Sequence, residues 1–391
     1  MSGALEHIRV IDVTAARAGP SCVRILADLG ASVIQVTRPG EGGVDSGLAD
    51  PDRENLHRNK RSVMIDLQKP QGQQLFLRLI ENADVLVENF RPDVKYRLKI
   101  DYDTLSSVNP RLVYGSISGF GQDGPYGHRP GVDQIAQGMG GLMSVTGPPG
   151  SGPWRVGIAI CDLAAGMYLA HGIMAALLER ERSGAGQWVQ TSLLEACVAL
   201  LDFQAARWLI EGDVAGQAGN EHPTVYPTGV FPTLDGAINI AATGDRAFTN
   251  FVTAIGLPDL AADARFKDRR TRAQNRPALR DICEAKTRDF GSDELIDKLN
   301  DAGVPAGPIL TIDEVFANPQ VQHLRMAAEV EGARGKLSLV RPAFNLSRTP
   351  PSVRSAAPVP GEHTREVLAE FGLDAAEVEA LATQGVIPNT P

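Results

Sequence analysis

The chain has 391 residues, of which 43% are hydrophobic and 22% charged, so its composition is that of an ordinary globular protein long enough for two or three domains. Its formal net charge of −9 argues against a nucleic-acid-binding protein, which usually presents a basic surface. No apolar stretch reaches the roughly 18–20 residues that a membrane-spanning helix needs, which argues against a membrane protein.

Strand and helix patterns alternate through the N-terminal third of the chain. One helix is predicted from Pro20 to Gly30 and another over Pro70–Glu81. Strands are predicted over Ile8–Val13, Ser32–Val36, Ser62–Leu67, Asp84–Glu88 and Leu112–Ser118. Strands that alternate with helices form βαβ units, so we expect an α/β fold around a mostly parallel sheet.

The middle of the chain begins with a loop over residues 119–131, which is dense in glycine and proline. A long helix is predicted from Asp162 to about Arg182, because apolar residues recur there at steps of three and four. The other elements predicted in this part are a helix over Gln134–Met139, a strand over Trp188–Thr191 and a helix over Leu193–Trp208.

The second half opens with a linker, which glycine and proline predict over residues 211–228. Beyond it we expect a strand over Gly236–Ala242 and helices over Phe248–Ile255, Arg276–Arg288 and Asp293–Ala302. The last predicted features are a turn over residues 303–308, an extended proline-rich segment over 350–360 and a helix over Thr364–Gly372.

Asp162 is the most informative residue, because an apolar run of small residues leads to this one carboxylate at the start of the long helix. Spacing alone favours a structural role, since aspartate is a preferred N-cap that accepts from the N–H groups of the first turn. The alternative is a reactive group in a dry pocket. A helix N-terminus favours the charged form of a carboxylate, which attacks an activated acyl group without a general base.

Other kinds of reactive centre have weaker signals. The turn Thr14–Pro20 holds one glycine, whereas an NAD or FAD fingerprint needs three. The four cysteines form no C-x-x-C pair, and the seven histidines show no metal-site spacing. We therefore expect no metal, no redox cofactor and a location in the reducing cytoplasm.

Basic residues gather at positions where open α/β sheets bind ligands. The run Arg58–Arg61 precedes a strand and is either a solvated turn or a set of phosphate contacts. Arg38, Arg91 and Arg97 follow predicted strands, and ligands of such sheets bind at the carboxyl ends of the strands. Arg97 is alternatively an ordinary surface charge of a helix.

Several blocks of sequence occur in an order and spacing that point to one family. In the first half the blocks are residues 12–14, 18–20, 26–34, 59–63, 84–92, 118–121, 124–126 and 136–147. In the second half they are Gly303–Pro308 and Gly361–Thr364. Together they span nearly the whole chain, and they resemble the class III CoA-transferase family, also called the CaiB/BaiF or formyl-CoA transferase family.

The resemblance implies a discontinuous, Rossmann-like large domain and a smaller α/β domain, in a chain that forms an interlocked homodimer. We expect the large domain to take residues 1–210 and, after the chain returns, residues 331–391. Residues 211–228 would be the linker and residues 229–330 the small domain.

By the same resemblance, Asp162 matches the catalytic aspartate of the family. It would attack an acyl-CoA thioester to give an aspartyl-acyl anhydride and then an aspartyl-CoA thioester, from which an acceptor acid takes CoA. Coenzyme A is then a substrate and no cofactor stays bound. The family's CoA contacts map onto Arg38, Asn89, Phe90 and Arg97, and we add Arg61 from the basic run.

Three departures from the family bear on the substrate. Formyl-CoA transferases carry glutamine in place of Arg17 and a run of glycines near Gly216–Pro223, so formyl and oxalate specificity are not implied. Arg17 is instead a candidate to clamp a substrate carboxylate. The racemase branch carries Gly-His-Asp where this chain has Gly131-Val132-Asp133, and valine removes one of the two bases that proton exchange needs. Asp133 remains a candidate substrate-binding residue.

We therefore predict an acyl-CoA:carboxylate CoA-transferase that acts through Asp162, with an acyl-CoA and a carboxylic acid as its ligands and with neither nucleic acid nor membrane as a partner. One alternative is an acyl-CoA racemase of the same superfamily. The other is a non-catalytic CoA-binding subunit in which Asp162 is only a helix cap.

Overall fold

The computed structural model describes residues 3–40, 50–332 and 335–389, and the chain divides into two compact units. The first unit comprises the chain up to Leu142, Arg155–Leu209 and the segment from Pro319 on. The second comprises Met143–Trp154 and Ile210–Asn318. The second unit thus includes residues 143–154, which lie outside the small domain expected from the sequence, and it ends before residue 330.

The first unit is built on a six-stranded parallel sheet with the strand order β3-β2-β1-β4-β5-β6. Its strands are β1 (Arg9–Asp12), β2 (Ser32–Thr37), β3 (Lys60–Met64), β4 (Val85–Glu88), β5 (Val113–Ser118) and β6 (Trp188–Ser192). This confirms the predicted α/β fold. The order reverses between β1 and β4, and ligands of such sheets bind at the carboxyl ends of the strands at that point.

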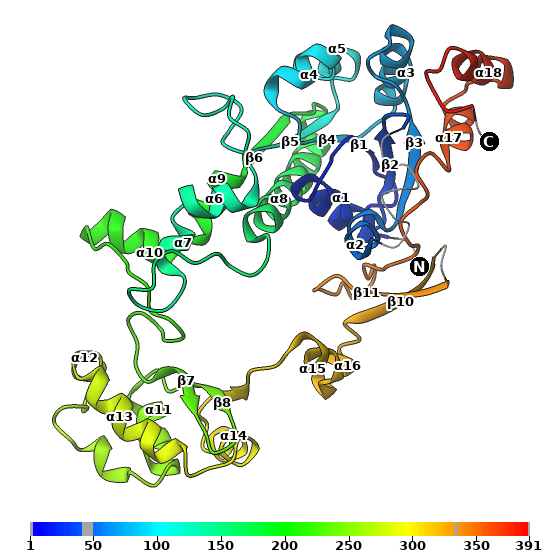
Figure 1. Cartoon of the computed structure of the whole chain (residues 1–391). Coiled ribbons are helices and arrows are strands. Elements are labelled where there is room, and N and C mark those ends of the chain that lie inside the picture. The colour runs from blue at the N-terminus through cyan, green and yellow to red at the C-terminus, as the bar shows by residue number, and fades with distance from the viewer. Residues whose placement is uncertain (1–2, 41–49, 333–334, 390–391) are drawn as a thin grey trace. The chain divides into compact units, whose positions relative to one another are not determined.

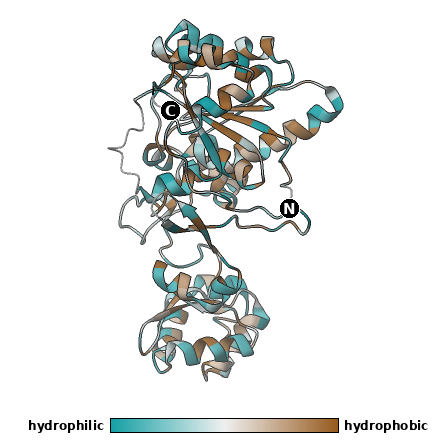
Figure 2. Ribbon diagram, turned by 90° about the vertical axis from the view of Figure 1, so that its right-hand side faces the viewer, coloured by the Kyte–Doolittle hydropathy of each residue, from teal (hydrophilic) through white to brown (hydrophobic). Residues whose placement is uncertain are grey.

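Helices cover both faces of this sheet (Figure 1), because successive strand residues point to opposite faces. On one face Val10 and Val85 pack with α1 (Ala18–Asp28), α8 (Ile160–Ser183) and α9 (Leu193–Leu200). On the other face, Ile11 and Leu86 pack with helices that include the C-terminal return. These are α3 (Pro70–Glu81), α5 (Tyr102–Val108), α17 (Thr364–Glu370) and α18 (Ala375–Thr383). Figure 2 shows the brown, hydrophobic strands enclosed between these layers.

The central helix α8 corrects one sequence expectation. Its 24 residues are long and apolar enough to cross a membrane by length and composition, although we expected no such stretch. In this fold α8 packs against α1 and β5, and Leu169 and Ile173 lie fully within the first core. The helix is therefore accounted for as the core helix of a globular unit.

The other elements of the first unit are short. The helix predicted over Leu193–Trp208 is broken at Asp202, whose φ of 44° lies outside the helical region, so that α9 is followed by separate turns. These elements are α2 (Pro51–His57), α4 (Pro92–Leu98), α6 (Asp133–Met139), α10 (Phe203–Ala206), α16 (Pro319–His323), β10 (Ala327–Gly332) and β11 (Gly335–Val340). Two further short elements span the limits between the units, α7 (Leu142–Val145) and the π-helical turn Arg207–Glu211.

The second unit has a three-stranded antiparallel sheet in the order β7-β8-β9, formed by Thr228–Pro232, Ala237–Ala241 and Ala306–Pro308. The last strand lies in the segment predicted as a turn, and Pro308 is tolerated there because the strand is at the sheet edge. The helical elements are α11 (Asp245–Ala254), a 3-10 turn (Pro258–Ala261), α12 (Arg269–Gln274), α13 (Arg276–Thr287), α14 (Ser292–Asp301) and α15 (Ile312–Ala317).

The basic run Arg58–Arg61 is not a solvated turn. Arg58 and Lys60 are buried and form ion pairs with carboxylates. Lys60 begins β3 and donates to Asp12 at the end of β1 over 2.8 Å, and neither side chain is exposed to solvent. Arg58 donates two hydrogen bonds to Asp28 and is also buried. Burial raises the pKa of Asp12, but the charge and hydrogen bond of Lys60 outweigh it and hold the pKa below its usual value.

The Asp12–Lys60 pair predicts a large loss of stability when one partner is removed. Replacing Lys60 by methionine leaves the Asp12 carboxylate buried without its cation, which should lower the free energy of unfolding by about 3–5 kcal/mol. Chemical denaturation followed by circular dichroism measures this change. As a control, Arg78→Gln removes an exposed ion pair with Glu377 and should change stability by no more than about 1 kcal/mol. Equal effects of the two substitutions would contradict the account.

Candidate active site

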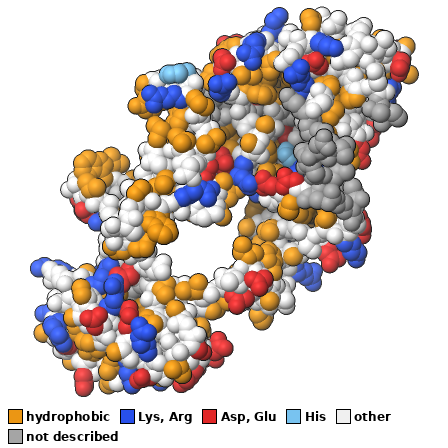
Figure 3. Space-filling view, viewed as in Figure 1, with side chains coloured by type: hydrophobic (Ala, Val, Ile, Leu, Met, Phe, Trp, Pro, Cys, Tyr) orange, Lys and Arg blue, Asp and Glu red, His pale blue; other side chains and the backbone are white. Residues whose placement is uncertain are grey.

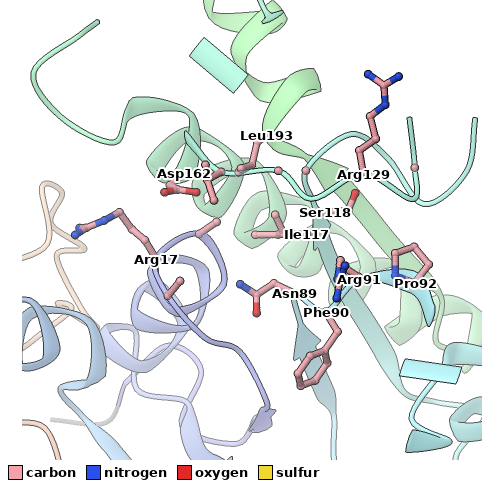
Figure 4. A pocket seen from close by; sticks show the side chains of 16 residues that line it. Arg17, Asn89, Phe90, Arg91, Pro92, Ile117, Ser118, Arg129, Asp162 and Leu193 are labelled. Carbon is pink, nitrogen blue, oxygen red and sulfur yellow. The ribbon is translucent and has the colours of Figure 1, made fainter. Parts of the chain in front are cut away.

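A crevice opens at the carboxyl ends of β1, β4, β5 and β6 (Figure 4). Its volume of about 150 Å³ suits a small acid or one end of a larger ligand. The lining residues are Ala16, Arg17, Ala18, Asn89, Phe90, Arg91, Pro92, Ile117, Ser118, Gly119, Gly127, Arg129, Gly131, Val132, Asp162 and Leu193. This is the place at which the strand order of an open α/β sheet predicts a ligand.

The loops that follow β1 and β4 are shaped by buried carboxylates. Asp12 accepts hydrogen bonds from the backbone N–H and the hydroxyl of Thr14, at 2.9 and 2.6 Å. Glu88 likewise accepts from the N–H of Phe90 at 2.8 Å. Each carboxylate also accepts from a buried lysine, Lys60 for Asp12 and Lys95 for Glu88. The chain is therefore turned out of the sheet at the ends of β1 and β4, two of the strands that border the crevice.

Asn89 ties these two loops together. Its side-chain oxygen accepts from the N–H of Ala15 at 2.9 Å, and its side-chain nitrogen donates to the carbonyl of Ala15 at 2.7 Å. Both functional groups of the amide are thus engaged by the neighbouring loop. Asn89 holds the two walls of the crevice at a fixed separation.

The position of Asp162 depends on close packing between α8 and α1. A Cβ atom on Gly166 would lie 2.8 Å from the carbonyl oxygen of Ala18 and 3.0 Å from the nitrogen of Cys22, so only glycine allows this approach. Asp162 lies four residues earlier and hence on the same face of α8. Its carboxylate is thereby placed beside the N-terminus of α1, where Arg17 lies.

Asp162 is not the N-cap of α8, contrary to the structural interpretation favoured by spacing. The helix starts at Ile160 and its N-cap is Ala159, whose side chain has no hydrogen-bond acceptor. The capping is done by Asp133, whose Oδ1 accepts from the N–H of Cys161 at 2.9 Å. Within the part of the chain that the structure describes, the Asp162 carboxylate makes no hydrogen bond or ion pair and faces the crevice.

The electrostatics of Asp162 also differ from the sequence expectation, in which the helix N-terminus favours the charged form. Burial and, next, the negative charge of Asp133 raise the pKa of Asp162 to about 6, while the positive charge of Arg17 opposes this. The desolvation of a half-buried carboxylate therefore outweighs the helix dipole here. The group is still mainly ionised at neutral pH.

The structure brings four of the predicted site residues together in the crevice, namely Arg17, Asn89, Phe90 and Asp162. Asp133 lies just behind them. It is buried, and besides capping α8 it accepts from Gln137 at 2.7 Å and lies 3.4 Å from Arg155. Its carboxylate is thus occupied by protein partners.

The other three predicted residues do not line the crevice. Arg38 lies 3.9 Å from Asp66 beyond the end of β2, and Arg97 is an exposed residue of α4 that lies 3.9 Å from Asp93. Arg61 donates to Glu366 and Glu370 of α17. The Glu370 hydrogen bond, the largest of several contributions, raises the pKa of Arg61.

Two arginines that line the crevice, Arg91 and Arg129, were absent from the predicted site. Arg91 follows β4 closely, and ligands of open α/β sheets bind at the carboxyl ends of the strands, so its position in the sequence already indicated the crevice. Arg129 lies in the loop over residues 119–131, over the ring of Tyr126 at 3.9 Å, and no periodic signal identifies it. With Arg17 they give the crevice three arginines against the single carboxylate of Asp162, which suits an anionic ligand despite the net negative charge of the chain.

The described residues hold no group of three or more His, Cys, Asp or Glu side chains that fits a metal ion. The four cysteines are buried free thiols, and burial raises the pKa of Cys161, beside Asp162, above its usual value. The charged side chains that line the crevice are the carboxylate of Asp162 and the guanidinium groups of Arg17, Arg91 and Arg129.

Comparisons with known proteins agree on one family. The sequence model of CoA-transferase family III matches residues 5–364. The chain is 38% identical to a succinate–glutarate CoA-transferase of Agrobacterium fabrum, over 94% of this chain and 95% of that protein. It is 35% identical to a succinyl-CoA–D-citramalate CoA-transferase of Chloroflexus aurantiacus, over 98% of both. A CaiB/BaiF family protein from Brucella suis has a similar crystal structure, with a TM-score of 0.83, 34% identity and coverage of 95% of this chain and all of that one.

The raised pKa of Asp162 predicts how stability depends on pH. The folded protein binds the Asp162 proton more tightly than the unfolded chain, so this group contributes stability at low pH that is lost as the pH rises through about 6. Asp162→Asn removes the effect. We expect the variant to gain stability relative to the wild type as the pH rises from about 4 to 7, in denaturant titrations at each pH.

The control for this prediction is Asp103→Asn, which removes an exposed carboxylate on α5. Its stability difference from the wild type should stay nearly constant over the same range. A constant difference for Asp162→Asn as well would contradict the environment described for Asp162.

Proposed function

We propose that this chain, which belongs to CoA-transferase family III, transfers CoA between two carboxylic acids by covalent catalysis at Asp162. The chain is a CoA-transferase by family, and CoA thioesters are its substrates. The observation that supports Asp162 as the nucleophile is its place in the crevice. Among the described residues it is a half-buried carboxylate without a protein partner, at the switch point of the parallel sheet.

The proposed reaction has two symmetrical halves. Asp162 attacks the thioester carbonyl of the donor, which gives an aspartyl-acyl anhydride and CoA thiolate. The thiolate then attacks the aspartyl carbonyl, which forms an aspartyl-CoA thioester and releases the donor acid. The acceptor carboxylate repeats these steps in reverse order, and CoA leaves on the acceptor while the Asp162 carboxylate is restored.

The environment of Asp162 suits this role. With a pKa of about 6 it is mainly ionised near pH 7 and needs no general base to attack. Partial burial removes water that would otherwise solvate the carboxylate. The surrounding arginines favour the anionic acids and thiolate that the reaction produces at this place.

We further propose that CoA lies along the walls formed by the loops after β4 and β5. Arg91 and Arg129 would bind its phosphates, and Phe90 would pack against the adenine or the pantetheine arm. Arg38 and Arg97 are proposed as outer phosphate contacts, since both are exposed. Binding at Arg61 would require a phosphate to displace Glu366 and Glu370.

We also propose a homodimer in the cytoplasm. Apolar side chains stand exposed around α10, where Trp208 is 57% and Leu209 80% exposed (Figure 3). Such patches usually mark a protein interface. The four buried free thiols fit a reducing compartment.

Trapping tests the proposed nucleophile. After incubation with succinyl-CoA and hydroxylamine, we expect a hydroxamate on Asp162, found by peptide mass spectrometry. Hydroxylamine would attack the aspartyl carbonyl of the anhydride or of the CoA thioester. Asp162→Ala should remove both the adduct and CoA transfer, by about a thousandfold or more, with an unchanged circular dichroism spectrum. Exchange of the α-proton in deuterated water without an adduct would indicate a racemase instead.

Light scattering tests the proposed assembly. The protein should elute with twice the 41.7 kDa mass of the chain at micromolar concentration. Leu209→Asp should increase the monomer fraction because it places a charge in the apolar patch, whereas Arg78→Gln on α3 should leave it unchanged. A monomeric wild-type protein at that concentration contradicts the proposal.

A further inference from the structure

We propose that Arg17 selects dicarboxylic acids by exchanging its partner Asp52 for the distal carboxylate of the substrate. The inference rests on the proposed function, since it takes Asp162 as the group that accepts the acyl chain. It adds a substrate class and a specificity-determining pair of residues, Arg17 and Asp52. A substrate with one carboxyl group would leave this pair undisturbed.

Arg17 stands where a substrate bound at Asp162 would extend. It is the residue directly before α1 and lines the same crevice as Asp162. Figure 4 shows both side chains on one wall, whereas Arg91 and Arg129 lie across the crevice. The positive charge of Arg17 also acts on the pKa of Asp162, so the two groups are electrostatically coupled.

The ion pair between Arg17 and Asp52 is weak enough for a ligand to displace Asp52. One nitrogen, Nη2, donates to Asp52 Oδ2 on α2 over 2.7 Å. Within the described residues, Nε and Nη1 of Arg17 make no hydrogen bond. The side chains of Arg17 and Asp52 are 33% and 43% exposed. An exposed ion pair of this kind favours its closed form over the open one by no more than about fivefold, so a ligand carboxylate can take the place of Asp52.

A dicarboxylic substrate would gain more from Arg17 than Asp52 does. A guanidinium binds a carboxylate through two parallel hydrogen bonds, and the unused donors of Arg17 allow this geometry. The crevice partly excludes water, which strengthens the contact. Succinate, glutarate and citramalate, after which the two related CoA-transferases are named, each carry two carboxyl groups.

The test compares two acceptors of equal chain length, glutarate and pentanoate, with succinyl-CoA as the donor. In a double displacement, kcat/KM for an acceptor depends only on its own half-reaction, so the ratio of the two values isolates the distal carboxylate. We expect the wild type to favour glutarate. Arg17→Gln should lower kcat/KM for glutarate by roughly 10- to 100-fold and change that for pentanoate by less than about threefold.

Asp52→Asn tests the exchange itself. The variant keeps Arg17 but removes its competing carboxylate, so KM for glutarate should fall by up to about fivefold with kcat unchanged. KM for pentanoate should stay unchanged. If Arg17→Gln does not fold, the Asp52→Asn variant alone tests whether the distal carboxylate displaces Asp52. Arg78→Gln, which removes an arginine outside the crevice, is the matched control and should leave both acceptors unaffected.

The outcomes separate this inference from the proposed function. If the wild type transfers CoA to neither acid and succinyl-CoA with hydroxylamine leaves no hydroxamate on Asp162, the proposed function fails and the inference falls with it. If the hydroxamate forms but neither acid is accepted, the inference alone is overturned. Suppose that the wild type is active. If Arg17→Gln then lowers kcat/KM equally for both acceptors, or Asp52→Asn shifts KM equally for both, the inference alone is overturned. A glutarate-specific loss of kcat/KM in Arg17→Gln or a glutarate-specific fall of KM in Asp52→Asn supports it, and the absence of both overturns it.

Discussion

Two buried pairs of a lysine and a carboxylate, at the ends of neighbouring strands, are the constraint on which the candidate site depends. Asp12, which pairs with Lys60, is the last residue of β1. Glu88, which pairs with Lys95, is the last residue of β4. A charge buried without its partner is strongly unfavourable, so each pair fixes its strand end and the loop that the carboxylate turns. The bonds of Asn89 to Ala15 then join the two loops, and the crevice is held open between them.

The second constraint is the placement of Asp162 by packing rather than by hydrogen bonds. Gly166 lets α8 approach α1, and Asp133 takes the capping role at the start of α8, which leaves the Asp162 carboxylate free of protein partners among the described residues. Burial and, next, the nearby charge of Asp133 raise the pKa of Asp162, and the charge of Arg17 opposes the rise. The Asp162 carboxylate is thus partly desolvated, has a pKa of about 6 and lines the crevice.

Much of the fold follows from local pattern. Pro70–Glu81 matches α3, and the strands of the parallel sheet except β3 lie within about two residues of their predicted limits. Buried apolar residues mark β1, β2, β4 and β5, whereas the edge strand β6 is only partly buried. The role of Arg58–Arg61 could not be predicted, since the partners Asp12 and Asp28 are some thirty or more residues away in sequence. For the same reason spacing misassigned the cap of α8, which Asp133 supplies from another helix. Arg17, Asn89, Phe90 and Asp162 were placed in the site by family resemblance, and Arg129 lacks any local signal.

In the proposed reaction an oxygen atom of each acceptor passes to Asp162, and transfer of an isotope label measures this most directly. The acceptor acid is labelled with ¹⁸O in its carboxylate and incubated with succinyl-CoA and the protein. In the proposed anhydride route one labelled oxygen stays on Asp162 after the first turnover. In later turnovers it leaves in the released succinate whenever it is the oxygen that attacks the donor. Peptide mass spectrometry should therefore find ¹⁸O at Asp162 and in succinate. Formation of the acceptor thioester without label at Asp162 would contradict the account.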